Sequence, residues 1–298
     1  MPESPRGALT LLRQRWGAAL FERVAGADGP EKRTRIHDLP GPRWFAEDRF
    51  IRTVHADAAM FVGGLRALLL QSLHPLAMAA VAAHSGYRGD PWGRLQRTST
   101  FLAVTTFGTA SDAQAAVNAV RRVHRQVRGV ARDGRTYRAG DPHLLGWVHV
   151  AEVDSFLRCH QRYGAAPLDD DGCDAYVADM ARIGAALGVV DPPRDRAELT
   201  ARLEDYRPEL HGTPEAREAA RFLLLNPPVP LVARVPYAAL ASAAVADLPA
   251  WARWPLRLPY LPVTEATAVR LGGHGIVSAL RWVMTAPASG SQPTPSKS

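Results

Sequence analysis

Apolar residues recur at intervals of three and four along almost the whole chain, and this helical period constrains the fold more than any other feature. Alternating strand patterns are scarce, and the best of them, residues 101–107, also fits the end of a helix. A chain of 298 residues is long enough to bury a large core. We therefore expect a single all-α, multi-helix globular domain. The expected helices cover residues 7–24, 57–83 with a bend at Pro75, 93–106, 111–129, 143–164, 170–187, 195–206, 213–224, 231–246 and 263–285.

The composition is that of an ordinary globular protein, with 47% hydrophobic and 22% charged residues. The two cysteines, Cys159 and Cys173, form no CxxC pair, which argues against a zinc ribbon, an iron–sulfur cluster or a disulfide framework. The N-terminal segment lacks the uninterrupted apolar core of a signal peptide. The most apolar stretch, residues 67–83, contains polar residues and is short for a membrane span. We expect a cytoplasmic protein with no transmembrane segment.

The chain is basic, with a formal net charge of +7, and nearly all of its positive charge is arginine. A basic chain is compatible with a nucleic-acid partner. However, no recognisable nucleic-acid-binding module accompanies these arginines. We therefore expect a small-molecule substrate and no nucleic acid.

Residues 226–262 depart from the long-helix pattern because they are rich in proline, with Trp251 and Trp254 between the prolines. Proline prevents a long amphipathic helix, so we expect short helices with both tryptophans packed as a C-terminal lid. Weak contact with a membrane surface is the alternative, since tryptophan and arginine suit an interface. The composition of residues 289–298 predicts a disordered tail, which leaves residues 1–288 as the domain.

One histidine, His124, lies in the apolar stripe of an arginine-rich helix with the sequence VNAVRRVHRQVRG. A histidine on such a face must find a hydrogen-bond partner or a metal. Arg121 and Arg128 lie at the edge of the stripe, where they could offer guanidinium groups to an anionic cofactor. The alternative is a core histidine whose hydrogen bonds are satisfied. The stripe consists of Ala113, Ala116, Val117, Val120, Val123, His124 and Val127.

A second segment, PWGRLQRTSTFL, places Arg94, Arg97, Thr98 and Phe101 on one helical face. Two arginines and a hydroxyl on an inward face are costly unless they meet an anion, a carboxylate or a polar ligand. A surface patch or an internal salt bridge explains the same pattern.

A third segment, DPHLLGWVHVAEVDSFLRCHQRYG, has a stripe that is too polar for a plain core face. His149 and Glu152 lie one turn apart in it, so they could ligate a metal together or belong to a polar network between helices. A weaker signal is the run from Gly63-Gly64 to His74-Pro75, where the glycines suggest close helix approach and the helix is expected to open before the proline.

Other catalytic signatures are missing from the sequence. It contains no GxSxG elbow, GxxxxGK[ST] phosphate loop, HExxH zinc helix or strand-borne GxGxxG fingerprint. The heme-attachment motif CxxCH is also missing, so any heme would be bound non-covalently.

Four segments together resemble the family of rubber oxygenases (latex-clearing proteins) and mpaB-type oxygenases. They are GGLRALLLQSLHP, GRLQRT with the following TTFG, VRRVHRQVRG and YRAGDPHLLGWVH. The resemblance implies an all-α fold around a buried pocket that holds a non-covalent heme b. It implies that His124 is the proximal iron ligand and that Arg94 and Thr98 line the pocket.

The chain departs from latex-clearing proteins at Arg97, where those proteins carry a lysine that acts on the distal side. An arginine cannot ligate iron or act as a base near neutral pH. Rubber cleavage itself is therefore not expected. For the heme propionates, the cationic candidates are Arg94, Arg97, Arg121 and Arg128.

The sequence thus predicts a heme-dependent oxygenase that uses O2 or peroxide to cleave or hydroxylate a hydrophobic small molecule. The alternative from another class is a heme-binding sensor or carrier without turnover, whose iron would take a second protein ligand such as His149 or His74. A third interpretation is a non-heme metal enzyme that uses His124, His149 and Glu152.

Overall fold

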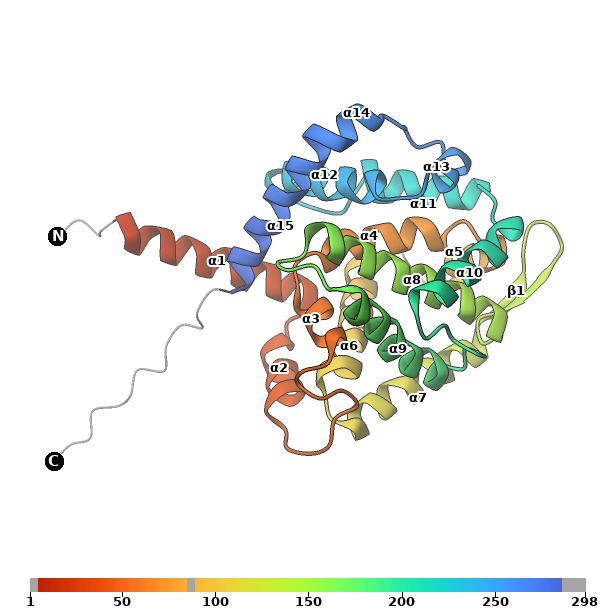
Figure 1. The fold of residues 1–298 in the computed structure, drawn as a ribbon, viewed down its shortest axis with the longest axis horizontal. Coiled ribbons are helices and arrows are strands. Elements are labelled where there is room, and N and C mark those ends of the chain that lie inside the picture. The colour runs from red at the N-terminus through yellow and green to blue at the C-terminus, as the bar shows by residue number, and fades with distance from the viewer. Residues whose placement is uncertain (1–4, 85–88, 286–298) are drawn as a thin grey trace.

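A computed structural model describes residues 5–84 and 89–285, and Figure 1 shows helices throughout this part of the chain. The predicted all-α fold is confirmed. The expected tail, residues 289–298, lies outside the described residues. The helices are α1 Pro5–Ala25, α2 Gly29–Asp38, α3 Phe50–Ala56, α4 Met60–Gln71, α5 Pro75–His84, α6 Pro91–Phe107, α7 Ala110–Gln126, α8 Pro142–Tyr163, α9 Asp170–Leu187, α10 Arg196–Tyr206, α11 Pro214–Leu225, α12 Leu231–Ala246, α13 Ala250–Leu256, α14 Pro262–Thr264 and α15 Arg270–Met284, with a 3-10 turn η1 Arg207–Glu209 and a π turn η2 Glu265–Val269.

Side-chain caps explain where several of these helices begin. Asp90, Thr109 and Asp141 each accept a hydrogen bond from a backbone N–H in the first turn of the helix that follows, which satisfies one of its free donors. The expected bend at Pro75 is a complete break between α4 and α5. Proline cannot donate the backbone hydrogen bond that a continuous helix needs there.

The core is centred on α4 and α8, which pack side by side in the middle of the molecule (Figure 1). Gly63 makes this close approach feasible, because a Cβ atom at that position would lie 2.8 Å from Cδ1 of Phe156. Trp147 on α8 is fully buried, and its Nε1 donates to the carbonyl of Gln71 at the end of α4. Helices α11 to α13 cover one side of this pair, whereas α6, α7 and α9 lie on the other (Figure 1).

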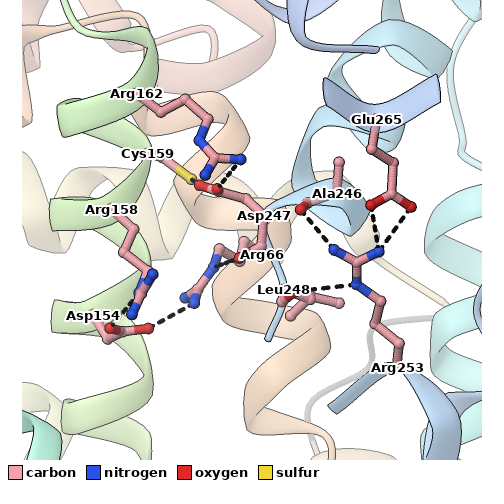
Figure 2. Close-up of polar contacts among 10 residues, drawn as sticks. All are labelled: Arg66, Asp154, Arg158, Cys159, Arg162, Ala246, Asp247, Leu248, Arg253 and Glu265. Carbon is pink, nitrogen blue, oxygen red and sulfur yellow. Dashed lines mark hydrogen bonds and ion pairs between the residues drawn. The ribbon is translucent and has the colours of Figure 1, made fainter. Parts of the chain in front are cut away.

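Buried charges tie α8 to α4 and to the α12–α13 turn, and Figure 2 shows that these charges are paired. Arg66 contacts Asp154 at 2.7 Å, donates to the Ser155 hydroxyl at 2.6 Å and donates to the carbonyl of Asp247 at 2.9 Å. Arg158 also pairs with Asp154, Arg162 and the Cys159 thiol contact Asp247, and Arg253 pairs with Glu265 beside them. We call these side chains the α4–α8 ion network; they are Arg66, Asp154, Arg158, Cys159, Arg162, Asp247, Arg253 and Glu265.

The chain after His124 differs from the expectation. Helix α7 ends at Gln126, and a two-stranded antiparallel hairpin follows, β1 Arg128–Val130 and β2 Thr136–Arg138. Arg128 is therefore an exposed strand residue and not part of the helix. The Asp133-Gly134 pair, with Gly134 at φ +85°, is the turn signal that could have predicted this hairpin.

Near the C-terminus, the lid expectation is half right. Trp251 packs against the core and lies 5.2 Å from the guanidinium of Arg207, but the Trp254 side chain is 88% exposed. Within the described ranges, no single helix has both the length and the apolar character needed to cross a membrane. Two sharply bent pairs, α3–α4 and α12–α13, meet that criterion by length and composition alone.

Candidate functional site

His124 lies on the last turn of α7 and is partly buried. Its Nδ1 is buried and has no hydrogen-bond partner among the residues that the structure describes. Desolvation lowers the pKa of its imidazole, so the ring is neutral at pH 7. A neutral ring is the form that binds a metal. The buried part of the apolar stripe on α7 is narrower than expected, because Val123 is 57% exposed.

Helices α6 and α7 carry these candidate residues, pack against one another and are joined only by Gly108 and Thr109. Arg94 and Thr98 lie in the half of α6 that is far from this turn, and His124 lies in the far half of α7.

The three α6 candidates differ in their surroundings. Arg94 is partly buried, whereas Arg97 and Thr98 are exposed. Arg97 pairs with Asp90 at 3.2 Å, and the Thr98 hydroxyl donates to the carbonyl of Arg94 at 3.0 Å. Of the inward face expected for this helix, only Arg94 and Phe101 are partly buried.

Helix α9 packs against both α7 and α8. Arg121 on α7 donates to the carbonyl of Ala186, and the ring of His149 on α8 lies against Gly184, where a Cβ atom would be 2.8 Å from Cε1. Arg121 therefore contacts the C-terminal end of α9 through a backbone carbonyl, whereas His149 packs against the side of α9 at Gly184.

Two groups on α8 are strongly desolvated. His149 is buried, which lowers its pKa to about 4, and its Nε2 has no hydrogen-bond partner in the described chain. Burial also raises the pKa of Glu152 to about 7, although that side chain keeps some accessible surface. Burial therefore favours the neutral, protonated form of the Glu152 carboxyl.

A polar contact that sequence reasoning missed lies where α3, α6, α8 and α9 meet. Nδ1 of His55 is 2.8 Å from the Thr106 hydroxyl, and its Nε2 is 3.4 Å from the Tyr176 hydroxyl. The ring packs edge-on against Phe156, and burial lowers the pKa of His55 to about 3. The signal was present, since Ile51, His55 and their neighbours follow a helical apolar spacing.

The structure also brings together two histidines and a glutamate. His74, between α4 and α5, meets His143 in the first turn of α8 and Glu209 in η1, and one ligand atom of each lies within 4.8 Å of the others. Among the described residues, this is the group of three with metal-ligand geometry. His124, His149 and Glu152 are not part of this group, and the non-heme interpretation that uses them stays a prediction.

Comparison with known proteins adds the family. The catalytic-domain family described as ER-bound oxygenase mpaB/B'/Rubber oxygenase matches residues 52–285, which confirms the predicted family. Two proteins, Mb2261 of Mycobacterium bovis and Rv2237 of Mycobacterium tuberculosis, are each 40% identical to the chain over 109 residues. This aligned region covers 36% of the chain and 42% of each relative. No solved structure matches.

The family match includes all the candidate site residues described above, and it runs from α3 to the last turn of α15. It spans well over half of the chain, so it applies to the helical domain as a whole. The chain belongs to the mpaB/rubber oxygenase catalytic-domain family, a family of oxygenases.

Proposed function

We propose that this protein is a heme b-dependent oxygenase acting on a hydrophobic small molecule, with His124 as the iron ligand. The observation that carries the proposal is the His124 ring. It is neutral, and its buried Nδ1 finds no hydrogen-bond partner within the described part of the chain. A buried polar atom without a partner is costly, and a metal bound to that nitrogen offsets the cost.

The helix pair α6–α7 carries apolar residues that fit a heme better than a small polar cofactor. Phe101 and Leu102 on α6 and Val120 on α7 are apolar and only partly buried. Arg94 on α6 is a candidate partner for a propionate. Arg121 near the end of α7 and Arg128 at the start of β1 are exposed. They could therefore contact a cofactor only at its solvent-facing edge.

When bound, heme supplies the oxygen chemistry, either cleavage or hydroxylation. The chain's own residues hold it, orient the substrate and limit the access of water. An apolar lining favours an apolar substrate and protects a reactive site from water. The exposed, paired Arg97 has neither the position nor the acid–base chemistry of a distal base. We therefore do not propose rubber as the substrate.

The competing function is a heme sensor or carrier without turnover. The observation that favours it is the buried Nε2 of His149, which no described residue satisfies and which could serve as a second ligand. The former His74 alternative is weaker, because that ring faces His143 and Glu209.

A hemin titration followed by absorption spectroscopy tests the proposal. We expect the full chain to bind one hemin with a Soret band, and His124→Ala to lose that binding. His274→Ala is the matched control, since His274 is exposed on α15. Loss of binding in His149→Ala with His124→Ala unchanged would overturn the ligand assignment. Binding of carbon monoxide by the reduced protein distinguishes an open oxygenase site from a closed, doubly ligated carrier.

A further inference from the structure

The ring of His74, the ring of His143 and the carboxylate of Glu209 come from three distant parts of the sequence. Nε2 of His143 lies 2.9 Å from both carboxylate oxygens of Glu209, and Nε2 of His74 lies 3.4 Å from one of them. Each of the two imidazoles therefore directs its Nε2 at the Glu209 carboxylate. His74 is buried, whereas His143 and Glu209 are partly exposed, so the cluster opens to solvent on one side.

The hydrogen bonds within the cluster leave His74 unsatisfied. Its Nε2 is buried, and despite the 3.4 Å ion-pair distance to Glu209 it makes no hydrogen bond of acceptable geometry with any described residue. The backbone N–H of Ala77 donates to the His74 Nδ1 in a long hydrogen bond of 3.4 Å. The buried Nε2 of His74 is thus directed at a carboxylate and a second imidazole without a hydrogen bond of its own.

The surrounding structure holds the three side chains in place. The backbone N–H of His211 donates to the carbonyl of Leu73 at 2.7 Å, which fixes η1 against the α4–α5 junction. The Tyr206 hydroxyl donates to the carbonyl of His143 at 2.8 Å, and the two rings pack with their centroids 4.8 Å apart. A metal site needs this kind of support, because free side chains would lose entropy on binding.

We propose that His74, His143 and Glu209 bind one divalent transition-metal ion of the Zn2+ class, at a site separate from the proposed heme. Two imidazoles and one carboxylate are the ligands that zinc takes in open three-residue sites, and imidazole disfavours Mg2+ and Ca2+. The solvent-facing side of the cluster supplies the fourth position for water.

The two contacts with Glu209 need little adjustment to accept the ion. With metal–ligand bonds of about 2.1 Å and tetrahedral angles, the ligand atoms lie about 3.4 Å apart. The distance from His74 to Glu209 already has this value, and His143 needs to withdraw by about half an ångström from its 2.9 Å contact. His143 can do so because its ring is at the surface.

The test is a Zn2+ titration of the full chain after treatment with a chelator, followed by isothermal calorimetry and by thermal unfolding. We expect one Zn2+ per chain and a higher unfolding temperature with the ion. His143→Ala and Glu209→Gln remove exposed ligands, so both variants should fold. Loss of a supporting partner alone costs about tenfold to a hundredfold in metal affinity, so loss of a ligand should cost at least about a hundredfold.

His274→Ala and Glu47→Gln are the matched controls, since both positions are exposed and lie outside the cluster. They should bind Zn2+ like the unchanged chain. Substitution with Co2+ adds a second readout, because its visible absorption reports a nitrogen- and oxygen-ligated four-coordinate ion. Failure to bind one ion per chain, or binding that is unchanged in both His143→Ala and Glu209→Gln, would overturn the proposal. Hemin binding in the same variants should be unaltered, which separates this result from that of the heme proposal.

Discussion

The α4–α8 ion network and a set of buried histidines both place polar groups away from water, but they differ in whether those groups have hydrogen-bond partners. In the network, all three guanidinium nitrogens of Arg66 have partners, and so do those of Arg253, which contacts Glu265 and the carbonyls of Ala246 and Leu248 (Figure 2). The histidines instead keep a buried ring nitrogen for which the described part of the chain offers no hydrogen bond. We call these the open imidazoles; they are His74, His124, His149 and His160.

The contrast separates structural polar groups from candidate ligands. A buried charge is tolerated only when it is paired and hydrogen-bonded, and the network meets that condition. An imidazole can be buried as a neutral ring, and burial lowers the pKa of each open imidazole. Its spare nitrogen then costs stability unless something binds it. Each prediction below is a way to break or sharpen this comparison.

Removal of a network member should cause the largest loss of stability. Arg66→Met leaves Asp154 and the carbonyl of Asp247 without their central donor in a buried position. We expect the free energy of unfolding to fall by about 3–5 kcal/mol, as for other buried pairs that lose one partner. Denaturant unfolding measures this. A loss below about 1 kcal/mol would show that the network is no more than a set of surface pairs.

Glu152 should make the stability depend on pH. Its folded pKa of about 7 exceeds the unfolded value near 4.3, so the folded chain binds more protons between these values. Stability contributed at this position is therefore greatest below about pH 4 and is lost as the pH rises to about 7. Glu152→Gln should gain about 1–3 kcal/mol at pH 8 and almost nothing at pH 4. The control, Glu47→Gln, alters an exposed carboxylate. An equal gain in both variants at pH 8 would refute the burial argument.

Replacing an open imidazole should cost little in cofactor-free protein. In His149→Leu, an apolar side chain replaces a ring whose Nε2 lacks a partner among the described residues. Since a desolvated nitrogen disappears together with the ring, we expect stability within about 1 kcal/mol of the unchanged chain. The same unfolding assay applies. A loss as large as that of Arg66→Met would mean that His149 is a satisfied structural residue, and the comparison would fail there.

The smallest effect should come from a charge that is paired at the surface. Arg97 and Asp90 form an exposed ion pair at 3.2 Å. Arg97→Met should change the free energy of unfolding by about 0.2–1 kcal/mol, with the larger value at low salt. Unfolding at two salt concentrations checks this. A larger loss that salt does not reduce would place Arg97 in a buried contact.

Much of the fold could be predicted because helical period and caps are local signals. The helices expected at residues 170–187 and 231–246 coincide with α9 and α12. Aspartate and threonine caps explain where several other helices begin. The short helices α2 and α3 and the hairpin after α7 were missed. A helix of seven residues such as α3 shows barely two turns of periodicity, and the Asp133-Gly134 turn was not weighed as a hairpin signal.

The candidate site was less predictable, since it depends on contacts between distant segments. The spacing of Arg94 and Thr98 on α6, the α6–α7 turn and the place of His124 on α7 are local features, so they follow from the sequence. The meeting of His74, His143 and Glu209 requires the packing of α4, α8 and η1, which no spacing encodes. The sequence also could not predict that Arg97 points to solvent and pairs with Asp90. Arg97 lies at the edge of an amphipathic helix face, and only the packing of neighbouring helices decides which edge of that face they bury.

Rescue of a cavity variant tests the central claim, iron ligation by His124, most directly. In His124→Gly the side chain is removed, so free imidazole added to the solution can take its place. We predict that this variant loses the Soret spectrum of the hemin-bound chain and that imidazole restores it, whereas His274→Gly behaves as the unchanged chain throughout. A His124→Gly variant that binds hemin with an unaltered spectrum, without imidazole, would contradict the account.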